Sequence, residues 1–209
     1  MPSKIKYIKI FKFIFLLFYC LTYCNIGLSN YFDEKYKKAG ILIDENYYKK
    51  AILLYEEILK DNHQIASYKK SRIFNNIGYC YYKLNELKNA LNFYKKALDV
   101  DENFVVCLNN VAAVLMNQRK YKEALPHLTK AYQSDNGNIK VIFNLFVVNY
   151  YLKNNEDALN YIEEAFNIDE NYTIKRLRKK NISTNEIKKL RKYLKKKDKY
   201  YYVGFNLIS

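Results

Sequence analysis

Between residues 71 and 104 the apolar positions form two helical stripes, separated by a polar step at Asn85-Glu86. Bulky side chains mark one side of each stripe: Phe74, Ile77, Tyr81 and Tyr94. Small residues stand among them: Gly78, Ala90 and Ala97. An apolar stripe at this period predicts an amphipathic helix, and small residues allow two such helices to cross at close range. The stretch therefore predicts a helix–turn–helix hairpin.

The same arrangement recurs along the chain. The second small residue of the pattern is found four times, at Ala51, Ala90, Ala124 and Ala158, and the last two intervals are 34 residues each. Three further alanines keep the same phase: Ala97, Ala131 and Ala165. The first interval is 39 residues long, and its extra residues near 61–65 indicate a lengthened helix start or a longer connecting loop. Chance would not keep the 34-residue interval across two steps with the other alanines in phase, so the sequence predicts an array of repeats.

This 34-residue unit resembles the tetratricopeptide repeat at every diagnostic position of residues 71–104 except a proline near the end, where Glu102 stands. The resemblance implies an all-α fold, a right-handed solenoid of about four such repeats over residues 32–172. The implied units are 32–65, 71–104, 105–138 and 139–172. The first and last units depart most from the pattern, as expected of terminal repeats that leave one face unpaired.

In this family, fixed positions of each first helix line a concave groove. Carried onto this sequence, the resemblance implies these groove residues: Tyr36, Asn75, Tyr79, Tyr82, Lys83, Asn109, Met116, Phe143, Val147, Tyr150 and Tyr151. Aromatic and amide side chains suit an extended peptide or an inserted helix. The alternative is that several of these tyrosines pack against neighbouring helices. We expect a protein-interaction scaffold whose partner is a protein or peptide.

A carboxylate-clamp version of the family grips the C-termini of chaperones. Framed on residues 71–172, only Asn110 and Lys140 fit the clamp, whereas Asn75, Tyr79 and Asn144 occupy its other places. The clamp is therefore not predicted.

Catalytic and metal-binding chemistry find no support in the sequence. His63 and His127 lack the spacing of a zinc site, the five glycines are isolated, and no motif marks a nucleophile. We expect no enzyme activity, no cofactor and no metal. Cys80 and Cys107 fall on successive parallel helices, offset by about 10 Å along the axis. A disulfide needs Cα atoms within about 7 Å, so two buried free thiols are favoured unless the stacking shifts.

The net charge of +15 belongs to the two ends of the chain. Four lysines precede residue 13, and thirteen basic residues accompany two acidic ones between Lys175 and Lys199. Ser183 and Glu186 form a capping-box pattern, which predicts a basic helix that caps the last repeat within the region 173–199. An anionic membrane is the alternative partner of its cations: Lys188, Lys189, Arg191, Lys192, Lys195 and Lys196. Nucleic acid is not expected. The tail, residues 200–209, is aromatic and apolar.

Residues 1–29 resemble an export signal, with lysines, an apolar run from Phe13 and small residues at Gly27 and Ser29. Three fates remain open: a cleaved signal, an anchor retained through residues 13–28, or a lipid anchor at Cys24. We expect export to a periplasmic or secretory compartment. The alternative to the scaffold is a peripheral membrane protein held on anionic lipid by the basic helix. A cytosolic co-chaperone would instead require the leader to persist as an uncleaved helix.

Overall fold

The computed structural model describes residues 32–61 and 65–194 of the 209. The predicted leader and the aromatic tail lie outside the described residues, as do Lys195, Lys196 and the side chain of Arg191. Every regular element within the described ranges is an α-helix. None of these helices is long and apolar enough to span a bilayer.

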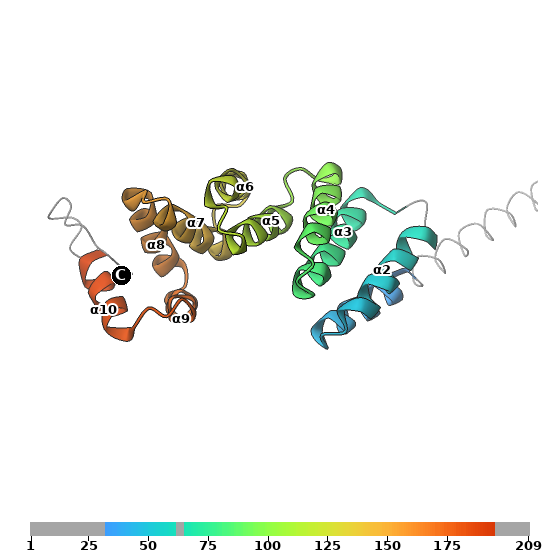
Figure 1. Ribbon diagram of the computed structural model, residues 1–209, viewed down its shortest axis with the longest axis horizontal. Helices are drawn as coiled ribbons and strands as arrows, with labels where there is room; N and C mark the ends of the chain where they lie inside the picture. The colour runs from blue at the N-terminus through green and yellow to red at the C-terminus, as the bar shows by residue number, and fades with distance from the viewer. Residues whose placement is uncertain (1–31, 62–64, 195–209) are drawn as a thin grey trace, which may run out of the picture.

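The helices form consecutive antiparallel pairs that stack into an elongated array (Figure 1). The first pair consists of residues 32–44 and α2 (Tyr48–Asp61). The following pairs are α3 (Ser67–Lys83) with α4 (Leu87–Val100), α5 (Val105–Asn117) with α6 (Tyr121–Ser134), and α7 (Ile139–Tyr151) with α8 (Asn155–Ile168). The last pair is α9 (Glu170–Lys179) with α10 (Thr184–Leu194). The predicted all-α solenoid is confirmed.

The longer first interval is explained by α3. This helix has 17 residues, whereas α5 and α7 have 13 each. Its start lies at Ser67, one turn before residue 71, so most of the extra length extends a helix rather than a loop.

Each pair is joined by the same tight turn, which contains a residue in the left-handed region. These residues have φ between 60° and 64°: Asn46, Asn85, Arg119, Lys153 and Asn181. After α3, the N–H of Asn85 donates to the carbonyl of Tyr82 (3.0 Å) and that of Glu86 to Tyr81 (2.9 Å), which is a Schellman motif. The α9–α10 turn repeats both bonds. The C-terminal region is therefore a further helical hairpin, built like the repeats, rather than a single capping helix.

Small residues mark the helix crossings. Gly78 of α3 faces α4 so closely that an added Cβ would lie 2.7 Å from the ring of Tyr94. Ala90, on α4, is fully buried at the same crossing.

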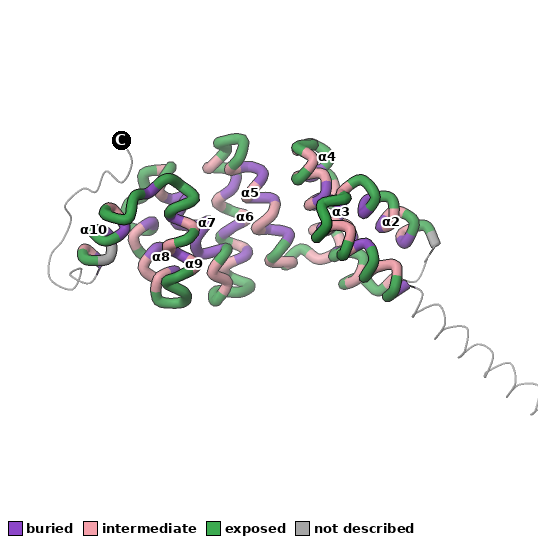
Figure 2. Tube along the Cα trace, turned by 90° about the horizontal axis from the view of Figure 1, so that it is seen from below, coloured by how far each residue is buried: buried purple, intermediate pink, exposed green. Residues whose placement is uncertain are grey.

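The last hairpin packs onto the repeats through an apolar face. Ile187, Leu190 and Leu194 of α10 are buried in one cluster with residues of α7, α8 and α9. The predicted capping box forms, since Ser183 N–H donates to the Glu186 carboxylate (2.8 Å) and Glu186 N–H donates to Ser183 Oγ (3.3 Å). α7 packs between its neighbours and is consequently buried from Val141 to Asn149 (Figure 2).

Candidate functional site

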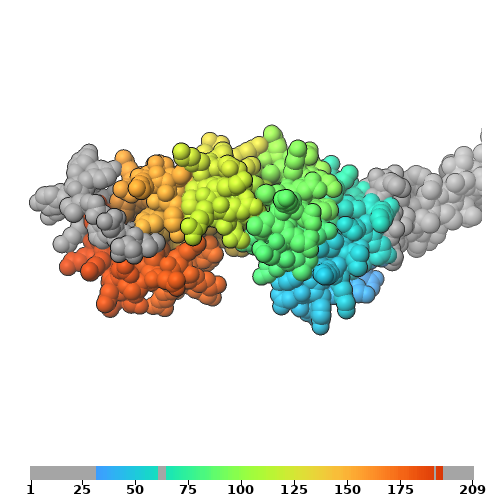
Figure 3. All heavy atoms as spheres, in the orientation of Figure 1, coloured from blue at the N-terminus to red at the C-terminus, as the bar shows by residue number. Residues whose placement is uncertain are grey.

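A hollow with a volume of about 850 Å³ lies where α3, α5, α7 and α9 face one another. Figure 3 shows the molecule hollowed on its underside, between the C-terminal helices and the N-terminal ones. We call this hollow the concave groove. Its lining residues are Tyr82, Asn109, Ala113, Met116, Asn117, Arg119, Tyr121, Lys140, Asn144, Val147, Tyr151, Tyr172, Lys175, Arg176, Lys179 and Lys180.

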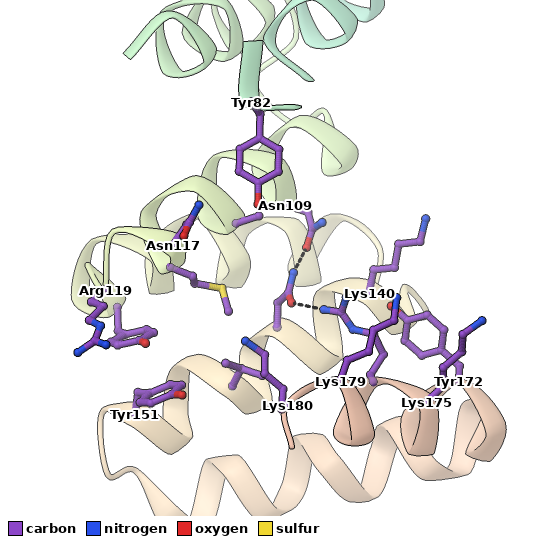
Figure 4. Close-up of a pocket in the computed structure, with 16 residues that line it drawn as sticks. Tyr82, Asn109, Asn117, Arg119, Lys140, Tyr151, Tyr172, Lys175, Lys179 and Lys180 are labelled. Carbon is purple, nitrogen blue, oxygen red and sulfur yellow. Dashed lines mark hydrogen bonds between the residues drawn. The ribbon is translucent and has the colours of Figure 1, made fainter. Parts of the chain in front are cut away.

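Amide side chains on the floor of the groove connect successive helices. Asn144 on α7 donates to Asn109 Oδ1 on α5 at 2.8 Å, and Arg176 on α9 donates to Asn144 Oδ1 at 3.2 Å (Figure 4). One helix earlier, Asn110 donates to Asn75 Oδ1 at 2.9 Å. Because a buried amide must find a partner, these bonds fix how each first helix sits on the next. The amides thus hold the groove in one shape.

Arg176 fastens α9 against α7. Its guanidinium lies 4.9 Å from the ring centroid of Phe143 and 6.0 Å from that of Tyr172, in addition to its bond with Asn144. Cation–π contacts of this kind favour a fixed guanidinium position. The Nε atom is buried and has no hydrogen-bond partner among the described residues. Arg176 therefore closes one end of the groove while keeping unused donors.

The charged residues that line the groove are all positive. Six of its lining residues are cationic and none is Asp or Glu: Arg119, Lys140, Lys175, Arg176, Lys179 and Lys180. Lys140, Lys175 and Lys179 gather at one end in Figure 4, whereas Arg119 lies at the other. A cleft lined by one sign of charge concentrates the field and attracts ions of the opposite sign.

The opposite end is aromatic. Tyr121 and Tyr151 stack with centroids 4.4 Å apart and planes 8° from parallel, and Tyr151 remains 45% exposed. Burial, together with the nearby Tyr151, raises the pKa of Tyr121, so its phenol stays neutral. This end offers a ring surface with a hydroxyl edge, which suits an apolar side chain next to a polar backbone.

Five of the residues predicted for the groove line it: Tyr82, Asn109, Met116, Val147 and Tyr151. Four others lie elsewhere: Tyr36, Tyr79, Lys83 and Tyr150. Tyr36 packs edge-on against Tyr55, and the Lys83 ammonium lies 5.8 Å from the ring centroid of Tyr48.

Two predicted groove residues require correction because neither of them lines the hollow. Phe143 is fully buried beneath Arg176 and beside Tyr172, so α9 covers the position that the repeat pattern leaves open. Asn75 is 5% exposed and serves as an acceptor for Asn110.

Sequence reasoning missed the contribution of α9 to the groove. The sequence predicts only that this basic run belongs to a helix that caps the last repeat. A usable signal exists in the amide spacing, since Arg176 follows Asn144 by 32 residues, close to the 35 that separate Asn144 from Asn109.

The two cysteines of the repeats, Cys80 and Cys107, are free and buried, as predicted. Burial raises the pKa of each thiol to about 12, so neither forms the reactive thiolate at neutral pH. Within residues 32–61 and 65–194, no group of three His, Cys, Asp or Glu side chains is placed to hold a metal.

The paired helices, their Schellman turns and the concave groove define a tetratricopeptide-type solenoid. Family models described as tetratricopeptide repeat match residues 71–104 and 105–134. Among solved structures, residues 41 to the end of MamA from Desulfovibrio magneticus RS-1 superpose with a TM-score of 0.60 at 13% identity, covering 81% of this chain and 97% of that one. YrrB, a TPR protein with an unusual peptide-binding site, gives 0.56 at 23% identity, covering 70% and 73%. These likenesses show the fold.

Curated relatives match over part of their length. The Uncharacterized protein ycf37 of Porphyra purpurea is 32% identical over 96 residues, which are 44% of this chain and 56% of that protein. The Protein STIP1 homolog of Dictyostelium discoideum is 30% identical over 129 residues, which are 59% of this chain and 22% of that protein. The chain thus spans about half of the first relative and about a fifth of the second.

Proposed function

We propose that this protein is a non-catalytic scaffold that binds a peptide segment of a partner protein in the concave groove. The observation that carries the proposal is the continuity of the groove, which draws side chains from α3, α5, α7 and α9 into one hollow. A site shared by several repeats recognises an extended stretch of chain rather than one small group. Protein–protein interaction is the role that the tetratricopeptide fold supports.

The chemistry of the lining fits a peptide. Met116, Val147 and the Tyr121–Tyr151 stack offer apolar area for side chains, while Asn109 and Asn117 offer amides for a backbone. Two structures of the same fold support this use. YrrB has a peptide-binding site, and the first TPR of Spaghetti (RPAP3), with a TM-score of 0.50 at 21% identity over 56% of this chain and 94% of that one, is bound to the HSP90 peptide SRMEEVD.

A random-peptide display library selected on the full chain tests the proposal. The selected peptides are synthesised, and their affinity is measured for the wild type and for the double variant Tyr82→Ala/Tyr151→Ala. Binding energy concentrates in a few central aromatic anchors, so the double variant should lose at least ~2 kcal/mol, about 30-fold in affinity.

The matched control replaces two exposed tyrosines outside the groove, Tyr47→Ala and Tyr68→Ala, which should leave the affinity within about twofold. Helicity by circular dichroism should stay near wild type in both double variants. If no peptide is enriched, or if the control pair matters as much as the groove pair, the groove is not the binding surface.

Attachment to anionic lipid is the second candidate function, and the exposed lysines of α10 favour it: Lys188, Lys189 and Lys192. The apolar face of α10 is covered by the repeats, so only electrostatic attraction remains for a membrane, at about 1 kcal/mol per cation. Sedimentation with phosphatidylserine vesicles tests this function. Salt-sensitive binding lost on Lys188→Gln/Lys189→Gln/Lys192→Gln would support it, and no sedimentation would exclude it.

Export through residues 1–29 is also a proposal. Its support is the sequence pattern of a basic region, an apolar run and small residues. Mass spectrometry of the mature N-terminus distinguishes a cleaved signal from a retained anchor and from lipidation at Cys24. A protein that keeps Met1 and stays in the compartment of synthesis would contradict export.

A further inference from the structure

We propose that α9 makes the concave groove selective for acidic peptide segments, that is, for stretches of a partner rich in Asp and Glu. The inference rests on the proposed function and adds the chemistry of the partner to it. It assigns the specificity of the groove to a helix that follows the four predicted repeats.

The first support is the unbalanced charge at the α9 wall. Lys175, Lys179 and Lys180 line the groove together with Lys140 of α7. None of them forms an ion pair with a carboxylate of the described residues. Like charges held near one another repel, so an incoming carboxylate gains from each of them. A neutral peptide would leave these charges uncompensated.

The second support is the unused hydrogen-bonding capacity of Arg176. A guanidinium has five N–H donors, and Arg176 donates one hydrogen bond, to Asn144. Its Nε is a buried donor without a partner in the described part of the chain. Phe143 and Tyr172 hold the guanidinium at the groove, so the side chain loses little conformational entropy when it binds a ligand. A planar donor fork of this kind matches the two oxygens of a carboxylate.

The third support is the shape of the site, which favours a peptide over the other polyanions. Lys175, Lys179 and Lys180 are exposed, but they line a concave hollow together with Asn109 and Met116, whose floor a flat bilayer cannot enter. Tyr121 and Tyr151 already stack on each other, so they do not offer separate platforms to successive bases, as a single-stranded nucleic-acid site would. An extended acidic peptide can reach the cations, the amides and the apolar floor together.

This arrangement differs from the carboxylate clamp of the family. The clamp draws its cations from the first helices of the repeats, and this sequence does not match it. Of the two residues that match the clamp, Asn110 donates to Asn75 and only Lys140 lines the groove. The basic residues proposed here come mostly from α9.

The test uses the peptides selected on the full chain and a copy of each in which Glu and Asp are replaced by Gln and Asn. Fluorescence anisotropy measures their affinity for the wild type and for Lys175→Gln/Lys179→Gln/Lys180→Gln, on α9 and at its C-cap, which we call the α9 variant. The acidic peptides should bind about tenfold or more tightly than their neutral copies, and the α9 variant should remove most of this preference. Raising the salt should weaken the acidic peptides much more than the neutral ones.

The matched control is Lys188→Gln/Lys189→Gln/Lys192→Gln on α10, which removes the same net charge outside the groove. It should keep the acidic preference within about twofold of wild type, because screening weakens charges beyond the groove. Circular dichroism checks that both variants keep their helices. A single-stranded oligonucleotide and phosphatidylserine vesicles serve as competitors.

The outcomes separate the two proposals. Groove-dependent peptides without an acidic preference, or a preference lost equally in the α9 and α10 variants, would overturn the acidic selectivity and leave the peptide groove intact. Binding of the oligonucleotide to the wild type but not to the α9 variant, with no acidic peptide bound, would overturn the proposal and assign the α9 cations to nucleic acid. The absence of any groove-dependent peptide would overturn the proposed function itself.

Discussion

At the scale of single residues, the fold depends on where glycine, which has no side chain, lies. Gly78 lies against the ring of Tyr94, which is buried at 1% exposed. Gly40, on the helix of residues 32–44, has nothing within 4 Å of the position of an added Cβ. The same residue type therefore has opposite structural roles in two helices.

Gly78→Ala should destabilise the protein by about 1–3 kcal/mol, because the new methyl group would overlap a buried ring. Gly40→Ala should raise the free energy of unfolding by up to about 1 kcal/mol, because alanine is the better helix former and the position is open. Urea unfolding followed by circular dichroism measures both. Equal shifts in the two variants would mean that Gly78 does not lie at a tight crossing.

At the scale of elements, the turns are more uniform than the sequence suggests. Asparagine fills the left-handed position in three turns and tolerates it, whereas the other two hold Arg119 and Lys153. Main-chain hydrogen bonds impose the same geometry on all five. The Schellman motif is thus fixed by the packing of the helix pair rather than by the residue at its tightest point.

Lys153→Gly should stabilise the protein by about 0.5–1 kcal/mol, because glycine adopts a positive φ without a Cβ clash. Lys153 is exposed, so its side chain loses no buried contact. Asn85→Gly is the comparison and should gain less, since asparagine already accepts this conformation. Differential scanning calorimetry compares the melting temperatures of the two variants. A lower melting temperature for the Lys153 variant would show that its turn is not under steric strain.

The sequence predicts the regular repeats because their signal is local. Gly78, Ala90 and Tyr94 lie within one hairpin, and the 34-residue interval repeats that hairpin. The groove residues of α5 follow from the same frame, as Asn109 and Met116 show.

The 34-residue repeat pattern does not predict the contact between α9 and α7. The left-handed residue of the last turn, Asn181, follows Lys153 by 28 residues rather than 34, so the final hairpin breaks the period. Its apolar stripe is also short and surrounded by lysines. The repeat frame consequently places Phe143 on an open surface, although α9 covers it. Which helix lies across a groove is a tertiary contact that no local pattern encodes.

At the scale of the whole molecule, the five helix pairs of the described chain form an arch (Figure 1). The concave groove lies beneath it, and a second, shallower hollow lies along α6, around Leu125 and Thr129. The first hollow combines amides, rings and six cations, whereas the second holds one lysine among apolar and neutral residues. Their volumes are nearly equal, at about 850 and 830 Å³, so the difference in chemistry is our reason for proposing that binding occurs on the concave side.

Site-specific photo-cross-linking tests this assignment most directly. A photoreactive amino acid is placed at Ala113, in the concave groove, or at Thr129, in the α6 hollow, and each full chain is irradiated with a selected peptide. Our account predicts a cross-linked product from position 113 that disappears when unlabelled peptide is added in excess, and none above background from position 129. A competed product from position 129 with none from position 113 would contradict the account and move the binding surface to the opposite side of the solenoid.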